Sequence, residues 1–147
     1  QDLYDAISEM WIIDAHNQAV LRFAGIVTAS VEERFRYARQ TGTQFWRDRD
    51  AVLAEMQRWL EWWRDVAMMR HELTENVTNI EWSDLLSEIA GEMKNDQVAA
   101  AVTAVQGART ALEANAAPQL ALEVLMLDLP WVDPVKVPSL DLEGKDG

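Results

Sequence analysis

The segment from Asn115 to Pro130 constrains the fold more than any other part of the chain, because it joins a helix stop, a helix start and a long apolar stretch. Asn115 is a residue type that ends helices, and Pro118 suits the first turn of the next one, where its missing N–H costs nothing. A helix this apolar must be covered on most sides, either by its own domain or by a partner. Its apolar residues are Leu120, Val124 and Leu127 at i, i+4 and i+7, with Leu122, Leu125, Met126 and Leu129 widening the surface.

Length and composition favour one helical domain. A chain of 147 residues can bury roughly 70% of the surface that its unfolded form exposes. Glycine (6) and proline (4) are scarce, and 49% of the residues are hydrophobic, which favours helix over sheet. No apolar run approaches the ~18 residues of a membrane span, and no signal or transit peptide is recognisable, so we expect a cytoplasmic protein. Since the chain starts at Gln1 without an initiator Met, we expect it to be a piece of a longer protein.

The net charge of −12 is unevenly distributed along the chain. Residues 1–30 carry four acids and one arginine, and residues 31–72 carry eight acids and eight arginines. Residues 73–147 carry thirteen acids against four basic residues. Such an acidic half repels a phosphate backbone, so we expect no direct contact of this half with nucleic acid.

The pattern of caps and apolar residues predicts an all-α domain. Ser30 and Glu33 have the spacing of a capping box that opens a short helix, and Thr41-Gly42 is expected to end it near Gln40. We expect a single bundle of about six helices over residues 1–130 and an irregular tail, extended or disordered, over residues 131–147. The predicted helices cover about residues 3–23, 30–40, 48–72, 83–93, 95–114 and 118–130.

The longest predicted helix carries a cluster of tryptophans, with a core stripe formed by Val52, Met56, Trp59, Trp63 and Val66, which lie within about 80° of arc on a helical wheel. Core packing is the expected role of Trp59 and Trp63. Trp62 flanks the stripe and is the best candidate of the three for a subunit interface. Base stacking is disfavoured because the surrounding charge is neutral rather than basic.

Two interpretations are open for Arg70, which extends the same stripe where another apolar residue was due. It can snorkel at the helix C-terminus, where the helix dipole favours a cation, or it can pair with a partner subunit or another domain. The remaining arginines of the middle region alternate with acids, which is typical of a solvated face: Arg34, Arg36, Arg39, Arg47 and Arg49.

The chain contains few of the motifs that carry chemistry. Neither phosphate-binding glycine pattern occurs, and the absence of cysteine excludes disulfides and thiolate nucleophiles. His16 and His71 lack the second histidine or the Glu at the spacing that metal-binding helices require. We therefore predict no catalytic, cofactor-binding or metal residues, and expect a helical module whose role is interaction.

Three landmarks follow one another along the chain. The first is the aromatic-rich stretch from Trp59 to Asp65, continued by an apolar run to Arg70. The second is a polar loop that ends at Asn79-Ile80 and leads into a pair of helices, from Leu85 and from Val98 onward.

The third landmark is the closing Asn-x-x-Pro-x-Leu-Ala-Leu-Glu segment that begins at Asn115. Over about residues 15–130, the three together resemble the C-terminal collar domain of bacterial clamp-loader subunits, most closely that of DNA polymerase III delta-prime. Gln119 stands where such proteins often have a basic residue, and the tail after Pro130 resembles nothing in them. The collar domain of the gamma/tau subunit and an unrelated helical adaptor are the alternatives, with a bundle enzyme as a more distant one.

The resemblance implies that this chain helps to hold the clamp-loader pentamer together. In that family, the collar domains of five subunits pack into a closed ring, while the preceding AAA+ modules handle ATP, DNA and the sliding clamp. Its partners would be the gamma/tau and delta subunits, with no small-molecule substrate, cofactor or catalytic residue in this fragment. Trp62 and Arg70 are the residues we expect at a subunit interface.

Overall fold

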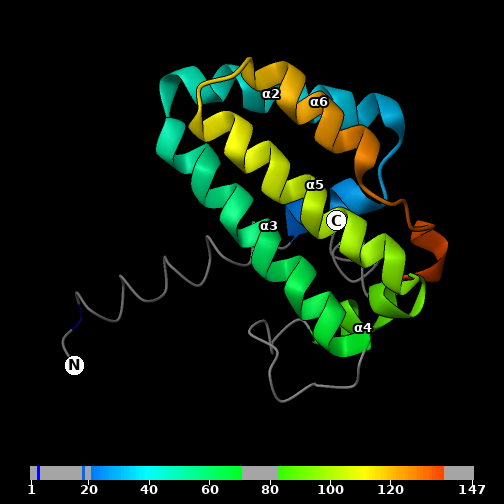
Figure 1. Ribbon diagram of the computed structural model, residues 1–147. Helices are drawn as coiled ribbons and strands as arrows, with labels where there is room; N and C mark the ends of the chain where they lie inside the picture. Colours follow the sequence, from blue (N-terminus) through cyan, green and yellow to red (C-terminus); the bar gives the residue numbers. More distant parts are fainter. Residues whose placement is uncertain (1–2, 4–17, 19–20, 71–82, 138–147) are drawn as a thin grey trace.

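The computed structural model describes residues 3, 18, 21–70 and 83–137 (Figure 1). Every regular element in these residues is helical, which confirms the all-α prediction of about six helices. Residues 21–27 are helical, and the other elements are α2 (Val31–Arg47), α3 (Arg49–Arg70), α4 (Ser83–Gly91), α5 (Asn95–Glu113), α6 (Pro118–Asp128) and the short 3-10 helix η3 (Pro134–Lys136).

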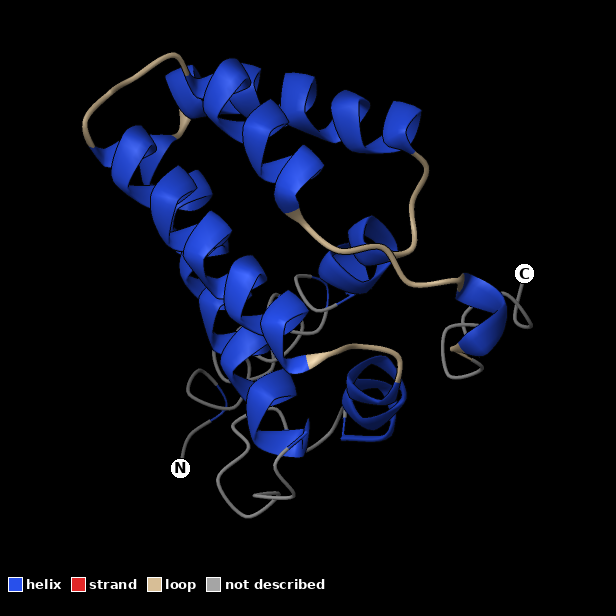
Figure 2. Cartoon of the chain, turned by 45° about the vertical axis from the view of Figure 1, so that its right-hand side comes forward, coloured by secondary structure: helices blue, strands red, loops and turns tan. Residues whose placement is uncertain are grey.

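The four long helices form two pairs. α3 packs along α5, and α2 packs along α6, while α5 also contacts α6 (Figure 1). The two pairs meet where short links join α2 to α3 and α5 to α6, and they diverge from that end (Figure 2). Arg49 closes the meeting point, because its guanidinium donates to the Glu113 carbonyl at 2.9 Å and to Asn115 Oδ1 at 3.2 Å.

The core is built around one phenylalanine and three tryptophans. The Phe23 ring lies 4.8 Å from that of Trp62, 5.2 Å from that of Trp63 and 5.3 Å from that of Trp59, measured between centroids. The predicted apolar stripe of α3 is buried throughout, which confirms core packing for Trp59 and Trp63. Buried aromatic surface of this size is a large part of what holds such a domain together.

The start of α2 follows the prediction, but its end does not. Ser30 Oγ accepts the backbone N–H of Glu33 at 3.2 Å and donates to the Glu33 carboxylate at 3.0 Å. The predicted glycine stop at Gly42 is wrong, because α2 continues to Arg47. Gly42 is buried inside the helix, and a Cβ there would lie 3.0 Å from the Cα of Gln119. The glycine thus permits close approach of α6.

The end of α5 and the start of α6 agree with the sequence. Asn115 has φ 57°, the left-handed conformation that asparagine tolerates after a helix, and Pro118 is in the first turn of α6. The segment after Pro130 is partly incorporated into the core, because Val132 and Val137 are 2% and 0% exposed. The described part of the predicted tail therefore packs on the domain as a strap, and residues 138–147 lie outside the described residues.

Arg34 joins the ends of two helices. It donates all five guanidinium hydrogens to backbone carbonyls at 2.8–3.2 Å, and it is 5% exposed. The prediction that Arg34 lies on a solvated face is wrong. Helix C-termini present carbonyls without intrahelical partners, and a planar cation with five donors satisfies them. The accepting carbonyls belong to Ile26, Val27, Met126, Leu129 and Pro130.

Candidate interaction surface

Helix α6 exposes an apolar stripe of Leu120, Val124 and Leu127, which we call the α6 stripe. These side chains are 62%, 49% and 64% exposed, and at 100° per residue they lie within about 60° of arc. The opposite face of α6 is buried through Leu122, Leu125, Met126 and the proline at its start. Within the described part of the chain, one side of α6 is therefore covered and the other side is open.

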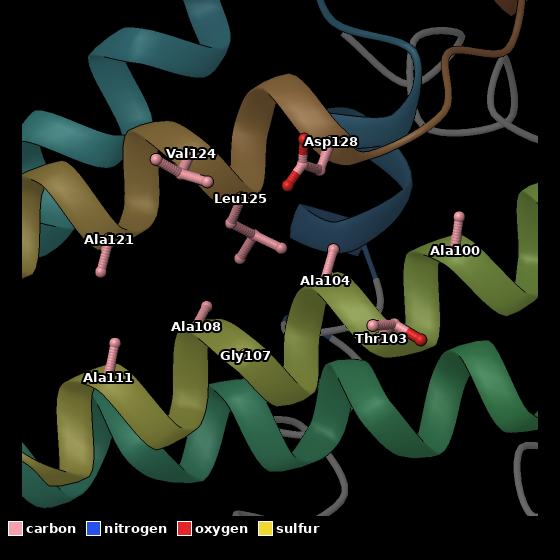
Figure 3. Close-up of a pocket in the computed structure, with 10 residues that line it drawn as sticks. All are labelled: Ala100, Thr103, Ala104, Gly107, Ala108, Ala111, Ala121, Val124, Leu125 and Asp128. Carbon is pink, nitrogen blue, oxygen red and sulfur yellow. The ribbon is translucent and has the colours of Figure 1, made fainter.

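A groove of about 630 Å³ runs between α5 and α6, beside the α6 stripe (Figure 3). On the α5 side its walls are almost entirely small residues, so the backbone of α5 is accessible to a large side chain. On the α6 side, Val124 belongs both to the groove and to the α6 stripe. The lining residues are Ala100, Thr103, Ala104, Gly107, Ala108, Ala111, Ala121, Val124, Leu125 and Asp128.

The described residues that line the groove include no basic side chain, and Asp128 is the only charged one among them. In α5 and α6 together the only basic residue is Arg109, and it forms an ion pair with Glu113 at 3.0 Å and donates to Gln57. The α5–α6 groove is therefore apolar with an acidic edge.

A second hollow, of about 780 Å³, lies between α2 and α3 and is polar. At its wall, Arg22 pairs with Glu55 at 2.7 Å, and the Tyr37 hydroxyl donates to the other oxygen of the same carboxylate. Burial, and next the Glu55 carboxylate, raise the pKa of Tyr37 well above its usual value of 10.0. The Tyr37 ring also stacks on that of Trp59, with 5.4 Å between the centroids, so this polar cluster borders the hydrophobic core.

The two predicted interface residues, Trp62 and Arg70, both have contacts within the chain. Trp62 is 1% exposed and packs against the Phe23 ring, so its indole belongs to the core of the described chain. Arg70 is half-buried and donates to the Ala90 carbonyl and to Asn95 Oδ1, both at 2.8 Å. Its guanidinium thus ties the end of α3 to the connection between α4 and α5.

The sequence carried the signal for the α6 stripe, since the apolar periodicity of the segment exceeds what one buried face needs. The groove had a weaker signal: Ala100, Ala104, Gly107 and Ala111 recur on one face of α5, and only the packing shows that they stay uncovered. Nothing in the sequence indicated the role of Arg34.

Other kinds of site find no support in the described residues. They contain no cluster of three or more His, Cys, Asp or Glu side chains that could hold a metal ion. The two histidines, His16 and His71, lie outside the described residues. None of the described helices combines the length and the apolarity that crossing a bilayer requires.

Comparisons of the chain with protein-family models, with curated proteins and with solved structures found no match.

Proposed function

We propose that this chain is a protein-interaction domain that joins another subunit through the α6 stripe. The observation that carries the proposal is the exposure of Leu120, Val124 and Leu127 on one face of a helix whose other face is buried. Full burial of one such side chain contributes on the order of 1.5–3 kcal/mol. Three adjacent ones, with the neighbouring groove, form the centre of an interface rather than scattered surface residues.

The assembly that we propose is the clamp loader of DNA polymerase III, with this chain as a collar domain. The order of the sequence landmarks supports this form of the proposal, with delta-prime as the favoured subunit and gamma/tau as the alternative. The collar would hold the pentamer together during sliding-clamp loading in the cytoplasm, and the partners would be the gamma/tau and delta subunits. ATP and DNA would be handled by modules N-terminal to this chain.

Light scattering on a sizing column tests the proposal. The chain is run alone and then mixed with the gamma and delta subunits of its own organism. Co-elution in an assembly of defined mass is the expected result. If the chain elutes as a monomer in the presence of both partners, while those partners assemble with their authentic delta-prime subunit, the proposal that it belongs to the clamp loader is wrong.

Paired substitutions locate the interface. Leu120→Asp and Leu127→Asp each place a charge in the α6 stripe without touching the buried face, and each is expected to weaken association at least about tenfold, which corresponds to about 1.4 kcal/mol. Val135→Asp is the matched control, because Val135 is 84% exposed and lies outside α6. Equal effects of all three substitutions would show that the α6 stripe is not the contact.

A further inference from the structure

The α5–α6 groove has the shape and charge of a site for a single helix. We propose that it binds an amphipathic helix of another protein, with large apolar side chains on one face and Lys or Arg at its flank. This proposal rests on the proposed interaction function and names the chemistry of the partner.

The shape of the groove requires large side chains from the occupant. Ala100, Ala104, Gly107 and Ala111 fall within about 60° of arc on α5, so this wall has no bulk of its own. From Ala100 to Ala111 it extends for about 16 Å, roughly three turns of helix. A partner helix can approach such a wall closely and place leucine-sized side chains against Val124 and the α6 stripe.

The charge of the groove requires a basic flank. α5 runs antiparallel to α6, so the start of α5 lies beside the end of α6 (Figure 3). Asp128 lines the groove at this end, and Asp96 lies one turn before Ala100 on α5. Neither Asp96 nor Asp128 has an ion pair or hydrogen bond with its side chain in the described part of the chain. A basic side chain at the end of the partner helix would neutralise both carboxylates.

A second copy of this chain is a poor occupant. Each copy carries a net charge of −12, which opposes self-association. The helices that would meet in a face-to-face dimer offer no free cation, because Arg109 is already paired with Glu113. Charge complementarity therefore favours a different, basic partner over self-association.

A designed peptide tests this chemistry directly. The probe is a capped helix of about 18 residues, long enough to be helical in isolation, with leucines at i, i+3 and i+4 spacing and lysines elsewhere. A scrambled peptide of the same composition controls for attraction to the acidic chain as a whole. A leucine–glutamate peptide of the same pattern controls for charge. Binding is measured by fluorescence anisotropy of the labelled peptide at dilute concentration.

The patterned leucine–lysine peptide is expected to bind at least about tenfold more tightly than either control, a difference of about 1.4 kcal/mol or more. Equal binding of the patterned and scrambled lysine peptides would overturn the proposal, because attraction would then be non-specific. Equal binding of the glutamate peptide would overturn the requirement for a basic partner.

A substitution that fills the groove locates the binding. A Cβ at Gly107 meets no atom within 4 Å, so the side chain of Gly107→Leu begins in open space at the groove. It is expected to weaken binding of the patterned peptide at least about tenfold. Ala54→Leu is the matched control, since Ala54 is exposed on α3 and lines the other hollow. Unchanged affinity of the Gly107→Leu protein, with its helical circular dichroism intact, would exclude the groove.

The two proposals fail separately. If the peptide binds as expected and the clamp-loader subunits do not co-elute, the proposal of a helix-binding groove is supported and the proposal of a clamp-loader subunit is rejected. If the subunits co-elute with the Gly107→Leu protein as well as with the unaltered chain, the collar role stands and the groove is not its contact.

Discussion

The two neighbours of α6 contact it in opposite ways. On the α2 side the two helices are in close contact. Gly42 lets the backbone of Gln119 approach α2, and Arg34 donates hydrogen bonds to carbonyls at the end of α6. On the α5 side the alanines leave a groove of about 630 Å³. Small residues occur on both sides, so their presence alone does not decide which interface closes.

The difference shows how one helix can be anchored and still be available for binding. The α2 side holds α6 at a fixed position, since both its backbone and its end are engaged there. The α5 side and the α6 stripe then present apolar surface from a rigid support, which limits the entropy lost on binding. The comparison predicts that substitutions on the closed side affect stability and that those on the open side affect association.

The largest effect is expected at Arg34. Arg34→Met keeps the length of the side chain but removes a donor from five carbonyls at two helix ends. Those of Ile26 and Val27 still accept the N–H groups of Ala29 and Val132, at 3.2 Å and 3.0 Å. We expect the free energy of unfolding to fall by more than about 3 kcal/mol. Each hydrogen bond to a charged donor contributes about 1.5–3 kcal/mol, and the total is less than the sum because water can solvate some of the carbonyls in the variant. Urea unfolding measures the loss. Arg34→Lys, which keeps the charge with fewer donors, should recover part of it. A loss below about 1 kcal/mol would show that the end of α6 is not held by this residue.

The same substitution on the two faces of α6 gives the next contrast. Leu122→Ala removes a side chain that is 0% exposed, and we expect a loss of about 2–5 kcal/mol in unfolding free energy. Leu127→Ala removes one that is 64% exposed, and the expected change is within about 0.5 kcal/mol. Thermal unfolding of both variants provides the comparison. Similar losses from both would mean that the α6 stripe is covered within the chain itself.

Two glycines compare the closed side with the open side. Gly42→Ala places a Cβ 3.0 Å from the backbone of Gln119, and separating the helices to relieve this contact costs about 1–3 kcal/mol. Since alanine recovers only about 0.5–1 kcal/mol through its helix propensity, a net loss of stability is expected. Gly107→Ala adds a methyl group in open space, so we expect a gain of about 0.5–1 kcal/mol from helix propensity. Denaturant midpoints measure both, and the opposite signs are the diagnostic result. A stabilising Gly42→Ala would contradict close packing of α2 on α6.

The smallest effect concerns the side of α2 that faces α3. Since the pKa of Tyr37 is raised in the folded state, the unfolded chain releases this proton first as the pH rises through about 10. Folding stability should therefore fall with increasing pH above that value. Tyr37→Phe is expected to remove the part of this loss of stability that comes from Tyr37. The unfolding free energies of the unaltered and the Tyr37→Phe proteins are compared at pH 9 and at pH 11, and the gap between the two proteins should change between these pH values. The same difference in unfolding free energy between the two proteins at both pH values would show that Tyr37 is free to ionise in the folded state.

The sequence predicts most of the helices because their signals are local. The serine cap of α2, the proline of α6 and the apolar stripe of α3 each act within a few residues of chain. Gly42 was misinterpreted because a glycine that ends a helix and a glycine that admits a second helix look alike in sequence. Only the position of Gln119 distinguishes them, and Gln119 is far along the chain.

The candidate surface was less predictable, for a related reason. The sequence showed that α6 was too apolar for one buried face, but periodicity does not say which side remains uncovered. On the helical wheel Trp62 flanks the α3 stripe, because the wheel considers α3 alone, whereas Phe23 from another segment packs against it. Arg34 alternates with acids as a solvated residue does, and its carbonyl partners have no signature in sequence because every residue carries one.

The Arg34 joint also has a consequence for the kinetics of folding. Three of its five acceptors lie 92, 95 and 96 residues further along the chain. Contacts of such separation require closure of a very long loop, so we expect them to form only after both halves of the chain have docked. If the hydrogen bonds of Arg34 form late in folding, their loss should accelerate unfolding while leaving the folding rate nearly unchanged. We therefore expect Arg34 to affect the lifetime of the folded domain more than the rate at which it forms.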